Sequence, residues 1–274
     1  MLNSGANPWS AAILGHIEGG TPNPIAALFS NGEKGGWWDP SDLATVFQDT
    51  AGTIPAGAND PVALIRDRSG NGLDLVQATT AQQPILQTDG TLWWLEFDAN
   101  ATSAFASSAD LDLTSTASAA VFNGYRVTAS GFGCKYEVSD AYDSHAGSFT
   151  EYISDGGGTY SLGGNATQTQ FSFGGEADVD YVSSCRYAIA DGLDCAASIV
   201  PRLNGAAAPG SVSQDGPLAG SAFGSWPLYV GARQATMIPI SHRLYGMVIV
   251  GRLVTGDEVA AAEAWLAEKS GVTL

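Results

Sequence analysis

The sequence predicts an all-β fold, and three observations lead to that class. Glycine contributes 34 and proline 12 of the 274 residues, and both are spread along the whole chain instead of gathered in one linker. Several segments alternate apolar and polar residues with a period of two, which is typical of strands with one buried face. Hydrophobic residues make up 45% of the chain, which is enough for a sizeable core.

The alternating segments give the expected strands in chain order. Three strands are recognised by residues that share one face. The first has Trp93, Leu95 and Phe97, the second has Phe171 and Phe173, and the third has Cys185, Tyr187 and Ile189. The later strands are expected at Ile199 to Leu203, Leu228 to Ala232 and Leu244 to Val250. The last is apolar on both faces, which predicts a central strand covered by a neighbouring sheet on one side and a helix on the other.

The sequence clearly predicts one helix, at the C-terminus. Thr255 followed by Glu258 forms a capping box, and Gly271 can supply the left-handed stop. Its apolar stripe is expected to dock on the sheets and consists of Val259, Ala262, Trp265 and Leu266. A shorter helical turn is expected to begin at Ser41, with Leu43, Val46 and Phe47 on one side.

Residues 1–35 are expected to form an arm, and residues 36–274 the single domain. Frequent Gly, Pro and Asn interrupt the arm and leave only brief apolar patches, which cannot bury a core alone. The arm is either a disordered leader or an extended segment that orders on a neighbouring subunit. The second is favoured by its apolar residues Ile13, Leu14, Ile25, Leu28 and Phe29.

Charge and hydropathy exclude several classes of partner. The chain has 11 Lys and Arg against 28 Asp and Glu, so its formal net charge is -17. This field repels phosphate backbones, so we expect no nucleic-acid partner. No window approaches the ~20 apolar residues of a membrane helix, and the first residues lack the pattern of an export signal. We therefore expect no membrane insertion.

Cysteines and histidines do not predict a metal site or a cofactor. Cys134, Cys185 and Cys195 include no CxxC pair, and the three histidines lie far apart without a ligand spacing. Buried free thiols are expected, although a bridge between Cys185 and Cys195 remains open if their segments pair. No phosphate-cradling glycine loop is present, so no nucleotide cofactor is expected.

Two groups of sequence blocks resemble a known family. The first group is Gly36 to Asp42, Asp67 to Gly72 and Leu95 to Asp98; the second is Arg202 to Gly205, Leu228 to Arg233, Leu244 to Gly246, Arg252, Leu253 and Glu258. Together they resemble concanavalin A-like (laminin G-like) jelly-roll domains of bacteriophage tail and head-fibre proteins. The resemblance implies an antiparallel jelly-roll β-sandwich over residues 36–274, and it is only suggestive for function.

The same blocks have a local physical interpretation. Asn204 and Gly205 predict a hairpin turn, because both residues tolerate a positive φ. The stretch from Asp67 to Gly72 resembles the start of a calcium loop, but Ala78 stands where the bidentate carboxylate belongs. An Asx-type turn is therefore favoured over a calcium site.

Catalytic motifs are weak in this sequence. A retaining glycanase needs two carboxylates ~5 Å apart, and the nearest pattern, Glu176, Asp178 and Asp180, would place three on one strand face. Mutual repulsion predicts that this face is solvated or holds a cation. No nucleophile elbow occurs either. We therefore expect no enzymatic activity, with a polysaccharide-degrading glycanase as the alternative.

Sugar binding needs aromatic platforms and planar polar groups. The candidate glycan-binding residues are Trp94, Tyr229, Arg233, Trp226, Tyr142, His145 and Tyr160. For each of them, ordinary packing is the competing interpretation.

The resemblance implies a non-enzymatic virion component: a fibre, spike or decoration protein assembled in the host cytoplasm. Its expected partners are other virion proteins, further copies of the chain in a homo-oligomer, and host cell-surface polysaccharide. A purely architectural module without a ligand is the other alternative.

Overall fold

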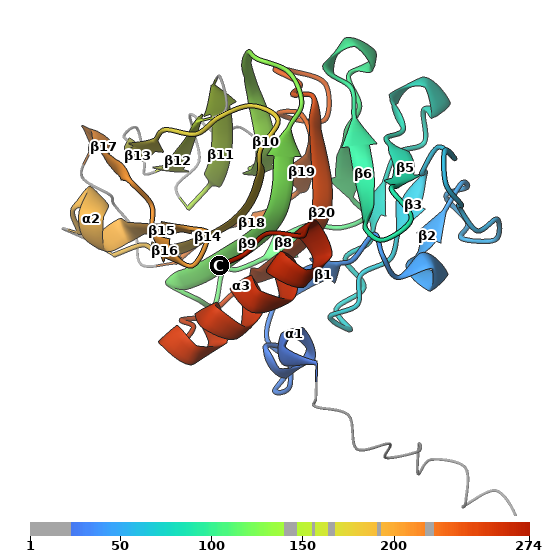
Figure 1. The fold of residues 1–274 in the computed structure, drawn as a ribbon. Coiled ribbons are helices and arrows are strands. Elements are labelled where there is room, and N and C mark those ends of the chain that lie inside the picture. Colours follow the sequence, from blue (N-terminus) through green and yellow to red (C-terminus); the bar gives the residue numbers. More distant parts are fainter. Residues whose placement is uncertain (1–22, 140–146, 155–156, 164–167, 191–192, 217–221) are drawn as a thin grey trace, which may run out of the picture.

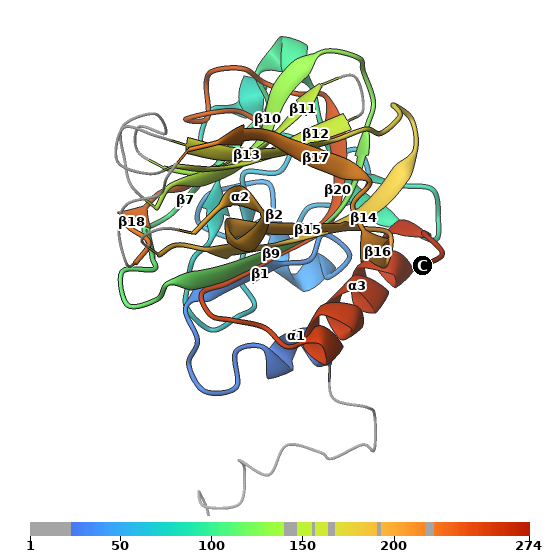
Figure 2. The ribbon, with the colours of Figure 1, turned by 90° about the vertical axis from the view of Figure 1, so that its left-hand side faces the viewer.

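The computed structural model describes residues 23–139, 147–154, 157–163, 168–190, 193–216 and 222–274. Within them the chain forms an antiparallel jelly-roll β-sandwich with a C-terminal helix, which confirms the predicted fold class (Figure 1). Figure 2 shows the two layers edge-on, with helices α1 and α3 beneath the layer that contains β9 and β14. All pairings between the described strands are antiparallel.

The sheet next to the helices is called the first sheet. In order of pairing, its strands are β16 (Ala206–Ala207), β15 (Ile199–Leu203), β14 (Asp180–Ala188), β9 (Ser118–Val127), β20 (His242–Val250), β6 (Trp93–Phe97) and β5 (Ile85–Thr88). Strand β1 (Gly35–Trp38) also pairs with β20. Strands β6, β14, β15 and β20 lie where they were predicted from the sequence. The start of β20 lies two residues earlier than expected.

The opposing layer is the second sheet. In order of pairing, its strands are β17 (Gly210–Asp215), β13 (Gln168–Phe173), β12 (Gly157–Gly163), β11 (Phe149–Ser154), β10 (Phe132–Val138), β19 (Leu228–Val230), β7 (Phe105–Ser107), β4 (Leu75–Val76), β3 (Leu64–Ile65) and β2 (Val46–Phe47). A separate pair joins β18 (Ser225–Trp226) to β8 (Leu111–Asp112). The main core lies between the two sheets and includes Leu95, Phe97, Tyr187 and Ile249.

The C-terminal helix α3 (Gly256–Ser270) forms as predicted. The Thr255 and Glu258 side chains each accept from the other's backbone N–H, and Gly271 ends the helix with φ 71°. The apolar stripe packs on the outer face of the first sheet. Central strand β20 is therefore covered on both sides, as its sequence predicted.

The described end of the arm packs on its own chain. Short helix α1 (Pro24–Ala27) is capped by Asn23, and Ile25, Leu28 and Phe29 are buried in one cluster with α3. These three residues therefore need no neighbouring subunit to bury them, contrary to the interpretation that the sequence favoured. Ile13 and Leu14 lie outside the described residues.

Several local expectations can be checked in the structure. Asn204 and Gly205 form the turn between β15 and β16 with φ 46° and 79°, as predicted. All three cysteines are buried free thiols, so the bridge between Cys185 and Cys195 is absent. The remaining helices are α2 (Cys195–Ser198) and the 3-10 turns η1 (Leu43–Thr45), η2 (Thr80–Gln82) and η3 (Ala99–Ala101).

Two expectations were wrong in detail. The segment after Ser41 forms only the 3-10 turn η1 before strand β2, and Leu43 is exposed. The acidic run does not lie on one strand face, because β14 begins only at Asp180 and Asp178 has a left-handed φ of 61°. The Asp180 carboxylate is also ion-paired with Arg126, and it accepts a hydrogen bond from the Tyr245 hydroxyl.

Candidate functional site

Trp94 lies on the outer face of the first sheet, opposite in phase to Leu95, but its ring is covered. The guanidinium carbon of Arg243 lies 4.5 Å from the ring centroid. The indole Nε1 donates to Glu96 Oε2 at 2.8 Å, and Arg243 Nε lies 3.1 Å from the same oxygen. With 7% of its surface exposed, Trp94 does not offer an open platform to a sugar.

Tyr229 and Arg233 lie near one another because both adjoin Glu137. Tyr229 of β19 is the cross-strand partner of Glu137 on β10, and Arg233 Nε lies 3.5 Å from the Glu137 carboxylate. Glu137 is fully buried and also accepts from the Gln234 backbone N–H at 3.0 Å. The Glu137 carboxylate therefore fixes Arg233 in place.

The other predicted residues do not join these. Trp226 is half-buried in β18, and Tyr160 of β12 is buried inside the sandwich among core aromatic rings. Tyr160 was a candidate glycan-binding residue, but its side chain lies in the main core between the sheets. Tyr142 and His145 lie outside the described residues. Of the predicted residues that the structure describes, it therefore brings together only Tyr229 and Arg233.

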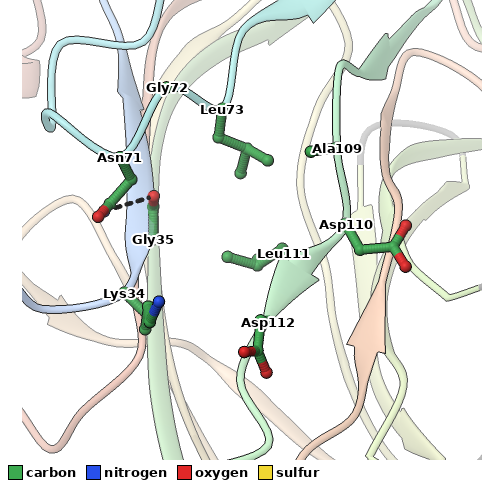
Figure 3. Close-up of a pocket in the computed structure, with 9 residues that line it drawn as sticks. All are labelled: Lys34, Gly35, Asn71, Gly72, Leu73, Ala109, Asp110, Leu111 and Asp112. Carbon is green, nitrogen blue, oxygen red and sulfur yellow. Dashed lines mark hydrogen bonds between the residues drawn. The ribbon is translucent and has the colours of Figure 1, made fainter.

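A small pocket, the turn pocket, opens between the Asn71–Gly72 turn and strand β8 (Figure 3). It measures about 110 Å³, and Leu73 and Leu111 form its apolar part. Lys34 and Asp112 lie across the opening from each other, whereas Asp110 points away from it (Figure 3). Hydrogen bonds from the Thr114 hydroxyl and N–H lower the pKa of Asp112. No aromatic ring lines this pocket.

The turn beside this pocket is the stretch that resembled a calcium loop. Asp67 accepts hydrogen bonds from the backbone N–H groups of Ser69 and Leu73, at 2.8 and 3.0 Å. It also accepts from the Trp37 N–H at 2.9 Å. The carboxylate is thus used as an Asx-type turn, as favoured from the sequence. Among the described residues no cluster of His, Cys, Asp or Glu has the form of a metal site.

A larger hollow, the tryptophan hollow, lies where α3 ends beside the start of β6. It measures about 260 Å³ and is lined by Ser41, Thr91, Leu92, Trp93, Glu268 and Lys269. Trp93 is half-buried: part of its indole packs on the core and part borders the hollow. An aromatic ring thus lies beside two hydroxyl groups, a carboxylate and an ammonium.

Hydrogen bonds and an ion pair fix two walls of the tryptophan hollow. Lys269 Nζ donates to Ser41 Oγ at 2.6 Å and lies 3.0 Å from the buried carboxylate of Asp39. On the other wall, Asp89 Oδ1 accepts from the N–H groups of Thr91 and Leu92, both at 2.8 Å. These bonds lower the pKa of Asp89 and fix the turn between β5 and β6. The hollow is therefore largely formed before any ligand arrives.

Sequence reasoning missed this hollow for two reasons. Trp93 shares a phase with Leu95 and Phe97, so it was expected to face fully inward, yet it lies at the first position of β6, where the core ends. Helix α3 was expected only to dock on the sheets through its apolar stripe. Its last turn meets Thr91 only through long-range packing, which no local pattern signals.

A third hollow, of about 410 Å³, lies beside the chain's C-terminal residue. Its charged side chains Arg202 and Glu263 form an ion pair, with Arg202 Nε 2.8 Å from Glu263 Oε1, and its remaining walls are Asn204, Gly205, Ala206, Ala260 and Leu274. Without an aromatic ring, it fits a sugar less well than the tryptophan hollow does.

No helix in the described part of the chain is long and apolar enough to cross a membrane.

Comparisons with known proteins support the fold but do not show a family. No protein-family model and no curated protein matches the sequence. Solved structures do match, among them the botulinum neurotoxin serotype G binding domain. Its TM-score is 0.53 at 11% identity, over 74% of this chain and 49% of that one.

Another solved match is the botulinum neurotoxin serotype D ligand-binding domain in complex with N-acetylneuraminic acid. Its TM-score is 0.50 at 8% identity, over 83% of this chain and 52% of that one. The chain thus spans about half the length of these structures. At such identities the likeness shows the β-sandwich fold alone.

Proposed function

We propose that this chain is a non-enzymatic carbohydrate-binding domain, and that the tryptophan hollow holds one sugar ring. The observation that supports this most is the partly exposed Trp93 indole beside Ser41, Thr91, Glu268 and Lys269. An aromatic ring can stack on the C–H face of a sugar while fixed polar groups bind its hydroxyls. The serotype D neighbour with its bound N-acetylneuraminic acid agrees with a sugar ligand on this fold.

Charge favours a neutral glycan over an acidic one. The chain has a formal net charge of -17, which repels anionic ligands at low ionic strength. Within the hollow, the Lys269 ammonium is paired with the buried carboxylate of Asp39, and Glu268 adds an exposed negative charge. Neutral hexoses are therefore the expected class, and sialylated glycans are expected to bind less well.

The glycanase alternative has weaker support. A retaining enzyme needs two carboxylates facing one groove, ~5 Å apart, one of them protonated as the acid. In the turn pocket, Asp110 points away from the opening (Figure 3), and the pKa of Asp112 is lowered. A lowered pKa makes Asp112 a poor proton donor near neutral pH. No release of reducing sugar is expected from this protein.

The wider role in the proposal is that of a bacteriophage virion component: a fibre, spike or decoration protein present in several copies. The resemblance of the sequence blocks supports this role. A surface made of small polar and acidic side chains also suits a particle in salt water, where charge repulsion is screened within ~10 Å. Several copies would turn a weak single-site affinity into useful avidity. Immunogold labelling of assembled particles tests this part; absence of the chain from purified particles would refute it.

A glycan array tests the binding function directly. The folded protein is expected to bind neutral glycans, and Trp93→Ala to lower the affinity at least about tenfold, equivalent to ~1.4 kcal/mol. Trp93→Phe keeps an aromatic ring and is the matched control, expected to retain most binding. Far-ultraviolet circular dichroism shows whether each variant is folded. If the wild-type protein binds no glycan, the architectural alternative is favoured; if Trp93→Ala binds normally, the hollow is the wrong site.

A further inference from the structure

An ion pair lies inside the sandwich, away from every surface hollow described above. Lys135 of β10 and Glu151 of β11 are 1% and 0% exposed, and Lys135 Nζ lies 2.7 Å from Glu151 Oε1. The register between β10 and β11 shifts between Cys134 and Tyr136, so Lys135 has no direct partner on β11. This bulge directs the long side chain inward.

The surroundings of this pair are aromatic. The Lys135 ammonium lies 3.4 Å from the centroid of the Tyr125 ring. Tyr136 and Tyr160 are the cross-strand neighbours of Glu151 on its two sides, and both are buried. These rings keep water away from the charged groups.

Burial favours the neutral forms of both partners. It lowers the pKa of Lys135 to about 8, although Glu151 opposes the change. Burial likewise raises the pKa of Glu151, against the effect of Lys135. Both effects act toward the neutral pair, in which the lysine nitrogen is an amine, the nucleophilic form of lysine.

A buried amide projects from β9, the strand that also carries Tyr125. Asn123 of β9 is 1% exposed, and its Oδ1 accepts no hydrogen bond from any described residue. It is the direct cross-strand partner of Ser183, whose hydroxyl lies 3.4 Å from Lys135 Nζ. Asn123 also precedes Tyr125 by two residues on the same strand, so both side chains project from the inner face. Two neighbours of Asn123 thus touch the lysine amine.

We propose that Lys135 and Asn123 join in an intramolecular amide bond, with Glu151 as the proton relay. Lys135 Nζ attacks Asn123 Cγ, the bond from Cγ to Nδ2 breaks, and ammonia leaves. Glu151 takes a proton from the lysine nitrogen and returns it to the leaving nitrogen. The reaction needs no oxidant and no cofactor, because one amine and one primary amide give one secondary amide and ammonia.

The product removes two unfavourable features of the interior. A buried ion pair loses the hydration of both charges, and a buried amide oxygen without a partner loses a hydrogen bond. After the reaction the ammonium no longer exists, and Glu151 can remain as a neutral acid that donates to the new amide oxygen. The bond would also join β9 of the first sheet to β10 of the second.

Mass spectrometry of the purified full chain tests the bond. The intact mass is expected to lie about 17 Da, one ammonia, below the mass of the sequence. Trypsin cleaves after Arg68, Arg126, Lys135 and Arg186 in an unmodified chain. In the linked chain, cleavage after Lys135 is blocked, so peptide 69–126 stays attached to peptide 127–186.

Variants separate the roles of the three residues. Glu151→Gln keeps the shape of the side chain but cannot relay a proton, so the folded variant is expected to show the unmodified mass. Asn123→Ala is also expected to show its own sequence mass. A wild-type chain with the full sequence mass and a free 127–135 peptide would overturn the proposal, whatever the variants do. A loss of about 18 Da would contradict it too, because that is water from condensation of Lys135 with a carboxylate.

Discussion

Replacing Leu266 should show how helix α3 is held on the first sheet. Gly124 and Gly246 pair across β9 and β20 and leave a shallow groove on the outer face. Leu266 is fully buried over this groove: a Cβ added at Gly246 would lie 3.2 Å from its Cδ2, and one at Gly124 3.5 Å away. Because glycines have no side chains that could move into the space, Leu266→Ala should leave a cavity. The expected loss is about 3 to 4 kcal/mol of unfolding free energy.

Urea unfolding followed by circular dichroism measures this loss, with an unchanged m-value as the sign that folding remains two-state. Leu253→Ala makes the same chemical change at a residue that is 70% exposed, and it should alter stability by less than about 0.5 kcal/mol. The opposite change, Gly246→Ala, should crowd Leu266 and Trp265 and cost about 1 to 3 kcal/mol. If Leu266→Ala lowers the free energy of unfolding no more than Leu253→Ala does, the position of the helix does not depend on this groove.

Three further predictions concern buried polar groups. Arg202→Met should lower stability by about 2 to 3 kcal/mol, measured by urea unfolding, because the buried carboxylate of Glu263 loses the guanidinium 2.8 Å away; an unchanged midpoint would contradict this. Burial lowers the pKa of His242 to about 4 from 6.5, so the unfolded chain binds the extra proton and stability falls as the pH drops through this range. His242→Leu should remove up to about 3 kcal/mol of this pH dependence; equal slopes in the two proteins would refute it. Burial raises the pKa of Cys134 and Cys185, so the thiol reagent DTNB should label them only after unfolding; rapid labelling of the native protein would show that they are accessible.

Features that depend on a few neighbouring residues were predicted well. The capping box of Thr255 and Glu258, the turn at Asn204 and Gly205, and the alternation in β6 each have a local physical cause. The apolar run of β20 also indicated its central place, since a strand without a polar face must be covered on both sides. The two-layer fold follows from these elements together.

Features that depend on distant packing were not predicted. Trp94 alternates out of the core as expected, but Arg243, which covers it, comes from a strand nearly 150 residues later. Lys135 lies in a segment for which the sequence predicted no strand, and only the bulge in β10 turns its side chain inward. The tryptophan hollow joins Thr91 to Lys269, a pairing that no local pattern contains.

The most direct test of the carbohydrate-binding account is a nuclear magnetic resonance titration with a neutral oligosaccharide. The chain has 7 tryptophans, and Trp93→Phe identifies the indole N–H signal of Trp93 by its disappearance. The account predicts that this signal and the backbone amides of Thr91 and Glu268 shift together and saturate as sugar is added. Shifts confined to another surface, or none at sugar concentrations that saturate the array signal, would contradict it.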